Sequence, residues 1–331
     1  MQQTRLSFDA LLGALGAAGE ETRLRLLLLL SEAELTVSEL VTILGQSQPR
    51  ISRHLKLLVE AGLVVRHREG SWAFFLAAPG EIARAISGLL DPQDPVHLSD
   101  RARLTDVRRA RDAQAARYFA VQAPNWDKIR ALHVPEERVE TSLRDILGIA
   151  PVHALLDLGT GTGRMLELLS PLADRAIGVD QSPAMLAVAR ARLERAGLRN
   201  VQLRQGDIYA VPVERNGYDL VVLHQVLHYL EDPGRALREA ARVLRPGGRL
   251  LVVDFAPHAE EALRESHAHR RLGFGHDEIE SYLDEASLDL ADHRDLPPLV
   301  GEGGKLTVSL WLARDRRTQA DTLPLSHREV A

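Results

Sequence analysis

The sequence predicts an α/β protein with two domains, and three observations support this. The chain has 331 residues, long for one domain and enough for two separate cores. Residues 1–90 show short helical patterns followed by a strand pair, whereas from residue 151 on apolar strands alternate with helical patterns. Between them, residues 91–150 indicate a helical connector that opens with a proline-rich turn. We therefore expect domains at 1–90 and 151–331, joined by this connector.

Composition restricts the class of protein further. Hydrophobic residues make up 45% and charged residues 26% of the chain, which is typical of a soluble globular protein. The apolar run Leu26–Leu30 is far shorter than the roughly 20 residues that span a bilayer, and no signal-peptide cleavage site follows it. The chain has no cysteine, which excludes disulfides, thiolate metal sites and cysteine nucleophiles. We expect a cytoplasmic protein outside the membrane.

The N-terminal domain has the pattern of a helix, a tight turn and a second helix. The first helix covers Thr36–Gly45 and ends at glycine. Ser47 can cap the second helix, and Pro49 sits in its first turn, where a missing N–H costs nothing. The apolar positions of the second helix recur at helical spacing. They are Ile51, Leu55 and Leu58.

The other positions of this second helix carry amide, hydroxyl and basic groups, which can bond base edges and phosphates in a major groove. They are Gln48, Arg50, Ser52, Arg53, His54 and Lys56. A strand pair follows at 63–76, and Arg66 and Arg68 make its tip basic, as expected for a wing on the DNA backbone. The whole chain has a net charge of −5, but residues 46–75 hold five basic against two acidic residues.

These motifs together resemble the ArsR/SmtB family of winged helix-turn-helix transcriptional regulators over about residues 10–90. The resemblance implies a homodimer that binds a double-stranded DNA operator, with helices at Phe8–Ala18 and Glu81–Leu90 in the dimer interface. Arsenic-sensing members carry cysteines where this chain has Thr36 and Ser38, so soft-metal sensing there is excluded. The segment Glu81–Leu90 lacks histidine, which argues against the zinc site that some relatives hold at this place.

The C-terminal domain shows short apolar runs separated by helical patterns. Such alternation predicts a parallel sheet with helices on both faces, a Rossmann-like arrangement. The runs are Ala154–Leu158, Ala176–Val179, Val201–Leu203, Leu220–Leu223 and Leu250–Phe255. Residues 306–312 alternate between apolar and polar instead, which indicates a final edge or antiparallel strand.

A glycine-rich turn and three acidic strand ends predict a nucleoside site. Gly159, Gly161 and Gly163 let backbone amides approach a ligand closely. Asp180 ends the second strand, 23 residues after Asp157, and can accept both ribose hydroxyls. After the third strand, an aspartate can bond an adenine amino group and an isoleucine can pack on the ring. These two residues are Asp207 and Ile208.

A dinucleotide site would need a further glycine at position 164, which is arginine here. Together with Asp219–His224 and Leu244–Leu250, the series instead resembles class I methyltransferases that use S-adenosylmethionine (AdoMet), over about residues 118–313. The resemblance implies a seven-stranded sheet that ends in an antiparallel hairpin, with AdoMet as cofactor at the strand ends. By position, the cofactor-binding residues are Asp157, Gly159, Gly161, Gly163, Asp180, Gln181, Asp207, Ile208 and His224.

The segment from Tyr118 to Asp127 resembles the helical lid that many small-molecule methyltransferases carry before this sheet. Its aromatic residues have an equally good explanation as core between the domains. The connector also holds six arginines against two aspartates between residues 101 and 117. A solvated helix face is the ordinary explanation, and phosphate contact or coupling between the domains is the alternative.

Methyl transfer needs a nucleophile held in line and often a base. The candidate catalytic residues are His224 and His228, which follow the fourth strand; packing or substrate shaping is the commoner role for such histidines. A second group, His267, His269 and His276 with Arg270 and Arg271, lies where relatives carry substrate-covering insertions. We expect no metal there, because no carboxylate completes a ligand spacing, and an anionic substrate is the better hypothesis. Arsenite methylation is excluded, because in similar enzymes it depends on cysteine thiolates.

The sequence thus predicts a DNA-binding regulator with a fused AdoMet-dependent methyltransferase domain that acts on a small molecule. Two alternatives stay open. In one, AdoMet or S-adenosylhomocysteine is only a sensed effector that shifts the DNA-binding state. In the other, the protein is a metabolic methyltransferase whose winged helix serves dimerisation. The methyl acceptor and the operator sequence are not encoded in any motif that we can identify.

Overall fold

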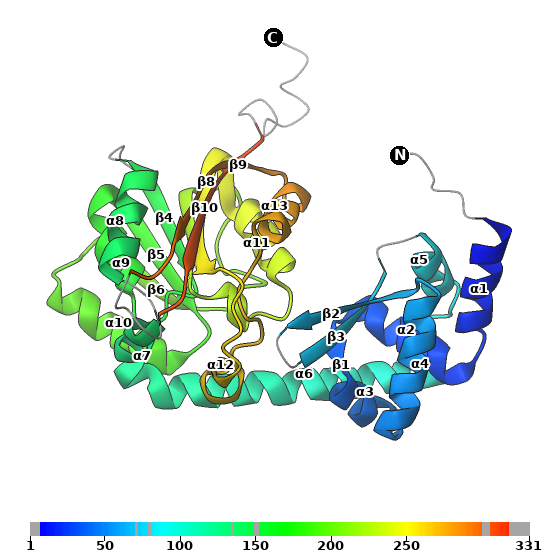
Figure 1. The fold of residues 1–331 in the computed structure, drawn as a ribbon. Helices are drawn as coiled ribbons and strands as arrows, with labels where there is room; N and C mark the ends of the chain where they lie inside the picture. The colour runs from blue at the N-terminus through cyan, green and yellow to red at the C-terminus, as the bar shows by residue number, and fades with distance from the viewer. Residues whose placement is uncertain are drawn as a thin grey trace, which may run out of the picture. The chain divides into compact units, whose positions relative to one another are not determined.

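The computed structural model describes residues 7–69, 72–78, 81–133, 136–148, 152–299 and 305–317. The chain forms two compact units, residues 1–114 and 115–331, and each unit has its own hydrophobic core (Figure 1). Helix α6 (Pro95–Gln122) contributes residues to both units. The domain boundaries expected at residues 90 and 150 stay predictions.

The first unit is a winged helix-turn-helix, as the sequence predicted. Its three-stranded antiparallel sheet has the order β1-β3-β2. The elements are α1 (Phe8–Ala18), α2 (Glu21–Glu32), β1 (Leu35–Thr36), α3 (Val37–Leu44), α4 (Gln48–Glu60), β2 (Val64–Glu69), β3 (Trp72–Ala77) and α5 (Glu81–Gly88). The turn expected between the two wing strands lies partly outside the described residues.

The residues at the helix ends and the spacing of apolar residues explain why α3 and α4 form. The Thr36 hydroxyl accepts a bond from the Glu39 N–H and the Glu39 carboxylate accepts one from the Thr36 N–H, so α3 begins with a capping box. Gly45 ends α3 with a φ of +65°. Ser47 precedes α4 as expected, but its hydroxyl makes no capping hydrogen bond. The predicted inward residues of α4 are at most 1% exposed and pack in the core.

Three of the six connector arginines, Arg101, Arg108 and Arg111, contact other elements of the first unit. Arg25 of α2 donates two hydrogen bonds, of 2.7 and 2.8 Å, to the buried Asp100 carboxylate of α6. Arg101 pairs with Glu32 at 3.0 Å, and Arg108 donates to the Glu32 carbonyl at 2.9 Å. Arg101 and Arg108 therefore help to hold α6 to α2.

The second unit is built on a seven-stranded sheet of order β6-β5-β4-β7-β8-β10-β9. The first five strands in this order are parallel, and β10 is antiparallel to both neighbours. The strands are β4 (Val152–Leu158), β5 (Ala173–Asp180), β6 (Val201–Gln205), β7 (Tyr218–His224), β8 (Leu244–Phe255), β9 (Leu288–Leu296) and β10 (Val308–Asp315).

Helices cover both faces of this sheet, which confirms the predicted class (Figure 1). Residues of α8 and α9 pack in one core cluster, and residues of α11 and α13 pack in the other. The helices are α7 (Trp126–His133), α8 (Glu136–Leu147), α9 (Arg164–Leu169), α10 (Pro183–Arg195), α11 (Pro233–Val243), α12 (Ala262–His267) and α13 (His276–Glu285). No helix in the described part of the chain combines the length and apolarity that a membrane span requires.

The final strands confirm the prediction of an edge or antiparallel strand. The alternating segment at 306–312 contributes to β10, which is antiparallel to both neighbours and lies inside the sheet. The edge position belongs to β9, which the sequence analysis missed. Four of the nine residues in Leu288–Leu296 are charged, and only Leu288 is fully buried, so the segment lacks the apolar run that marks a buried strand.

Candidate cofactor site and nucleic-acid interface

The predicted cofactor residues meet where the strand order reverses. The sheet places β5 on one side of β4 and β7 on the other. In open α/β sheets, ligands bind in the crevice outside the carboxyl ends of the strands at such a point. The turn at 159–163 leaves β4 there, Asp180 ends β5, and His224 ends β7.

The glycine turn has a backbone that side chains rarely permit. Gly159, Gly161 and Gly163 have φ angles of +70°, +52° and +78°. A Cβ atom on Gly159 would lie 2.5 Å from a methyl carbon of Val226, and one on Gly161 would lie 3.8 Å from Nε1 of Trp126. The turn therefore requires glycine, and Trp126 of α7 lies over it.

Two carboxylates flank the turn, the buried Asp157 and the partly buried Asp180. Asp157 is 1% exposed and accepts a 2.5 Å hydrogen bond from the Thr160 hydroxyl, and its burial raises its pKa to about 7. Asp180 accepts 2.8 Å hydrogen bonds from the N–H groups of Gly161 and Ser182. Burial also raises the pKa of Asp180. Asp180 thus ties the end of β5 to the glycine turn, and its oxygens keep lone pairs for further donors.

The remaining candidates for cofactor binding lie directly after β5 and β6. Gln181 is exposed, and its carbonyl accepts a 3.2 Å bond from the Gln205 amide. Asp207 is exposed and accepts a 2.9 Å bond from the Tyr209 N–H. Ile208 is partly buried against the core of the sheet. All three follow β5 or β6, so the structure brings them to the edge where the sequence analysis placed them.

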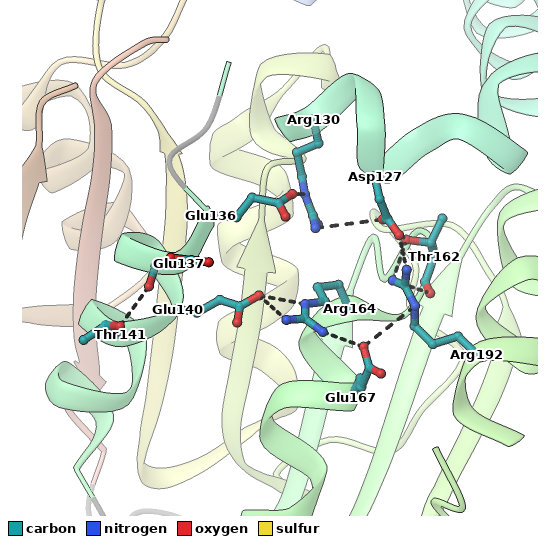
Figure 2. Close-up of polar contacts among 10 residues, drawn as sticks. All are labelled: Asp127, Arg130, Glu136, Glu137, Glu140, Thr141, Thr162, Arg164, Glu167 and Arg192. Carbon is teal, nitrogen blue, oxygen red and sulfur yellow. Dashed lines mark hydrogen bonds and ion pairs between the residues drawn. The ribbon is translucent and has the colours of Figure 1, made fainter. Parts of the chain in front are cut away.

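A network of charges joins α7 and α8 to the glycine turn (Figure 2). Asp127 of α7 accepts a 2.8 Å bond from the Thr162 hydroxyl in the turn and pairs with Arg192 of α10. Arg164, the first residue of α9, pairs with Glu140 of α8 at 2.6 Å. The segment before the sheet is therefore fastened to the turn from two helices.

Aromatic residues of the same segment pack with side chains of the second unit. Phe119 lies 5.4 Å from Trp126 and 4.9 Å from Tyr229, ring centre to ring centre. Tyr118 lies 6.2 Å from His267, and burial raises the pKa of its phenol to about 12. These contacts favour the lid over the alternative of a core between domains.

The two candidate histidines differ in their surroundings. His224 is 9% exposed, and burial lowers its pKa well below the usual value, so it is neutral. His228 is 1% exposed, and its Nδ1 lies 2.6 Å from the carboxylate of Asp254 at the end of β8. Within the described part of the chain, its Nε2 has no hydrogen-bond partner. Asp254 therefore orients the imidazole so that Nε2 offers a lone pair.

Sequence reasoning missed Asp254, although a usable signal existed. It stands in Val252-Val253-Asp254-Phe255 at the carboxyl end of an apolar strand, the position from which the other three aspartates were chosen. Its partner lies 26 residues away, so only the sheet order reveals the pair.

The expectation about metal ligands needs a correction. Two carboxylates, Asp277 and Glu280, do lie with His276, and ligand atoms of the three residues are all within 4.8 Å of one another. They share the first turns of α13, where residues four apart are neighbours. Arg270 and Arg271 each lie near a glutamate, at 3.7 and 3.5 Å, which weakens the hypothesis of an anionic substrate there.

The predicted DNA-contacting residues lie mainly on one exposed surface of the first unit. Those of α4 that are exposed are Gln48, Arg50, Ser52, Arg53 and Lys56. His54 differs, because its side chain is only 13% exposed and its Nδ1 lies 3.5 Å from the Glu20 carboxylate. Arg66 is exposed on β2, whereas the side chain of Arg68 lies outside the described residues.

Comparison with known families supports the assignment of both domains. The profile of a methyltransferase domain matches residues 156–252. The profile of bacterial regulatory proteins of the arsR family matches residues 20–65. The two matches confirm the resemblances drawn from the sequence.

Several curated relatives are similar to part of this chain. The uncharacterized methyltransferase YcgJ of Bacillus subtilis is 36% identical over 32% of this chain and 42% of its own length. The demethylmenaquinone methyltransferase of Thermus thermophilus is 40% identical over 31% of this chain and 47% of its own. The uncharacterized protein YafE of Escherichia coli is 32% identical over 44% of this chain and 70% of its own. The chain thus spans less than half the length of the first two relatives.

The raised pKa of Asp157 makes the ligand-free protein less stable as pH rises. Burial lifts the pKa from its usual 3.8 to about 7, so the folded state holds a proton that the unfolded state has lost. That stabilisation is complete below the unfolded pKa and is lost as pH rises through about 7. Between about pH 5 and about pH 8, the wild type should lose about 3 kcal/mol more unfolding free energy than Asp157→Asn.

Urea unfolding of both proteins at the two pH values measures this difference. The exposed carboxylate of Asp145 supplies the control, and Asp145→Asn should follow the wild type. An Asp157→Asn protein with the same pH dependence as the wild type would show that the buried carboxyl does not titrate in this range.

Proposed function

This chain belongs to the methyltransferase domain family and carries an arsR-family helix-turn-helix, and from this membership we propose that it is a DNA-binding transcriptional regulator that also methylates a small molecule. The observation that carries the enzymatic part of this proposal is the glycine turn. It lies where the strand order of the sheet reverses, and the carboxylate of Asp180 holds it against β5. Cytoplasm is the proposed location, because an operator-binding regulator acts where the DNA is.

The site residues fit AdoMet as methyl donor, which supplies an electrophilic methyl group on a sulfonium. Asp180 would accept the ribose hydroxyls with the lone pairs that its two backbone bonds leave. Asp207 and Ile208 would hold the adenine. The backbone of the glycine turn would approach the methionine portion, and the buried Asp157 would balance positive charge beside it.

His228 is the base that we favour for a methyl acceptor that carries a proton. Asp254 holds its Nδ1, so the Nε2 lone pair can accept that proton, and the imidazolium formed would be stabilised by the carboxylate. His224, kept neutral by burial, would shape the site beside it. A small-molecule acceptor is supported by the relative that is named demethylmenaquinone methyltransferase.

Two variants test the enzymatic proposal. Asp180→Ala should weaken AdoMet binding by at least about tenfold, because the ribose hydroxyls lose a charged acceptor. His228→Gln should bind AdoMet as the wild type does but lose transfer of radiolabelled methyl groups into the small-molecule fraction of a cell extract. Calorimetry and scintillation counting measure the two effects.

The outcomes separate the candidate functions. Binding of AdoMet by the wild type without any methyl transfer would favour the effector hypothesis over catalysis. Transfer that survives in His228→Gln would remove the base assignment, and unchanged affinity in Asp180→Ala would remove the ribose assignment.

The DNA-binding half predicts that Arg53→Ala weakens operator binding by about 5- to 100-fold, the cost of one base or phosphate contact. The probe is the duplex that the wild-type protein selects from a random DNA library, and fluorescence anisotropy over a salt series measures affinity. Arg144→Ala, which removes an exposed arginine of α8, is the matched control and should bind as the wild type does. Equal affinity of Arg53→Ala and wild type would refute a DNA-contacting role for Arg53.

We further propose that α1 contributes to a homodimer. Its apolar residues form an exposed stripe at helical spacing, which comprises Phe8 (78% exposed), Leu11 (43%), Leu12 (59%) and Leu15 (51%). The double change Leu12→Glu with Leu15→Glu should convert the dimer to a monomer in light scattering, because burying the new charges is costly. Val121→Glu, at an apolar site that is 71% exposed on α6, is the control. A double variant that remains dimeric would place the interface elsewhere.

A further inference from the structure

Helix α13 carries three potential metal ligands that take no part in the proposed cofactor site. They are His276, Asp277 and Glu280, which we call the α13 cluster, and one ligand atom from each lies within 4.8 Å of the other two. His276 and Glu280 are four residues apart, so they are neighbours on the helix surface, and Asp277 directly follows His276. His276 is partly buried, whereas both carboxylates are exposed.

The two carboxylates of the cluster differ from the other acidic residues of α13. Among the described residues, neither Asp277 nor Glu280 makes a hydrogen bond or an ion pair through its side chain. The other three acidic residues of the helix each pair with an arginine. These pairs are Glu278–Arg271 (3.5 Å), Asp284–Arg316 (2.7 Å) and Glu285–Arg238 (3.1 Å). The cluster therefore holds two negative charges that no cation in the described part of the chain balances.

The imidazole of His276 is held in place by ring packing rather than by hydrogen bonds. Its ring centre lies 4.3 Å from that of His293 on β9, and His293 in turn stacks on Trp311 of β10 at 5.4 Å. The Nδ1 atom of His276 is buried and, among the described residues, has no hydrogen-bond partner. The stack thus fixes the ring beside the two carboxylates and leaves a nitrogen for a ligand that the chain itself does not supply.

Two further ring nitrogens of this stack are buried and lack a partner in the described part of the chain. The Nε2 atom of His293 lies 3.2 Å from the Asp295 carboxylate but forms no hydrogen bond with it. The side chain of Trp311 is only 1% exposed, and its Nε1 donates to no acceptor that the structure describes. Buried polar atoms in native proteins are normally bound by protein, ordered water or an ion. Three unpartnered nitrogens in one stack therefore indicate a polar ligand at this place, such as an ion with its waters.

The donor set determines which ion fits. One imidazole with two carboxylates is a ligand set for Zn²⁺ and similar transition metals, whereas Ca²⁺ and Mg²⁺ prefer oxygen ligands alone. The cluster lies at the start of α13, where the helix dipole places roughly half a positive charge and opposes a cation. The full negative charges of Asp277 and Glu280 outweigh this effect.

We infer that His276, Asp277 and Glu280 bind a divalent transition-metal ion of the zinc type, with the remaining coordination positions filled by water. The inference does not depend on the proposed function, because none of the three residues belongs to the proposed cofactor site. Since α13 packs against β9, an ion on its first turns would also stabilise the folded state of this part of the second unit.

Titration of the untagged, chelator-treated full chain with Zn²⁺ provides the test. In calorimetry, the wild-type protein should bind one equivalent of Zn²⁺, and at least about tenfold more tightly than Ca²⁺. His276→Gln should weaken Zn²⁺ binding by at least about tenfold, and so should the double change Asp277→Asn with Glu280→Gln, because each removes ligands. Zn²⁺ should also raise the midpoint of thermal unfolding of the wild type more than that of either variant.

His153→Gln is the matched control, because His153 is an exposed histidine 2.7 Å from the Asp174 carboxylate and lies outside the cluster. It should bind Zn²⁺ as the wild type does. The double variant changes only exposed carboxylates, so its metal-free form should unfold at the same temperature as the metal-free wild type. Wild-type protein that takes up no Zn²⁺, or that prefers Ca²⁺, overturns the inference. Wild-type affinity in His276→Gln, or an equal loss in His153→Gln, also overturns it.

Discussion

The second unit depends on one constraint, the attachment of a left-handed glycine turn to the end of the neighbouring strand. Three glycines with positive φ carry the chain out of β4, a conformation costly for other residues. The Asp180 carboxylate fixes this turn by accepting the Gly161 N–H while it also caps the turn after β5 through Ser182. Burial opposes the ionised form of Asp180, and these two bonds offset part of that cost.

The same turn also anchors the segment before the sheet. Thr162 lies between two of the glycines and donates to Asp127, and Arg164 directly after them holds Glu140. The arginine that separates this sequence from a dinucleotide fingerprint thus has a positive role, since a glycine there could not bind α8. The turn and the first residue of α9 are thus the attachment points of α7 and α8 (Figure 2).

Periodicity and glycine spacing predicted much of this architecture, because both record local constraints. Apolar runs marked β4 to β8, and the capping pattern Thr36–Gly45 marked α3 within one residue at either end. The apolar pattern did not reveal β9, whose charged residues suit an edge, or Asp254, whose partner His228 follows a different strand. His54 was predicted to contact DNA from its residue type, but its partner Glu20 caps α2, which packs against α4. Side-chain direction and remote pairing are properties of the packed structure and leave no periodic trace in the sequence.

Helix α6 is one continuous helix that contributes residues to both units. Its first part is held to α2 by Arg25 and Asp100, and its last turns place Phe119 against Trp126 and Tyr229 near the glycine turn. A ligand can alter DNA binding only if its affinity differs between two states of the protein. Any such difference must arise where the ligand meets the protein, and Phe119 near the end of α6 packs against Trp126, which lies beside the glycine turn. Whether the cofactor is a reactant or also a signal therefore becomes a question about one helix rather than about two independent domains.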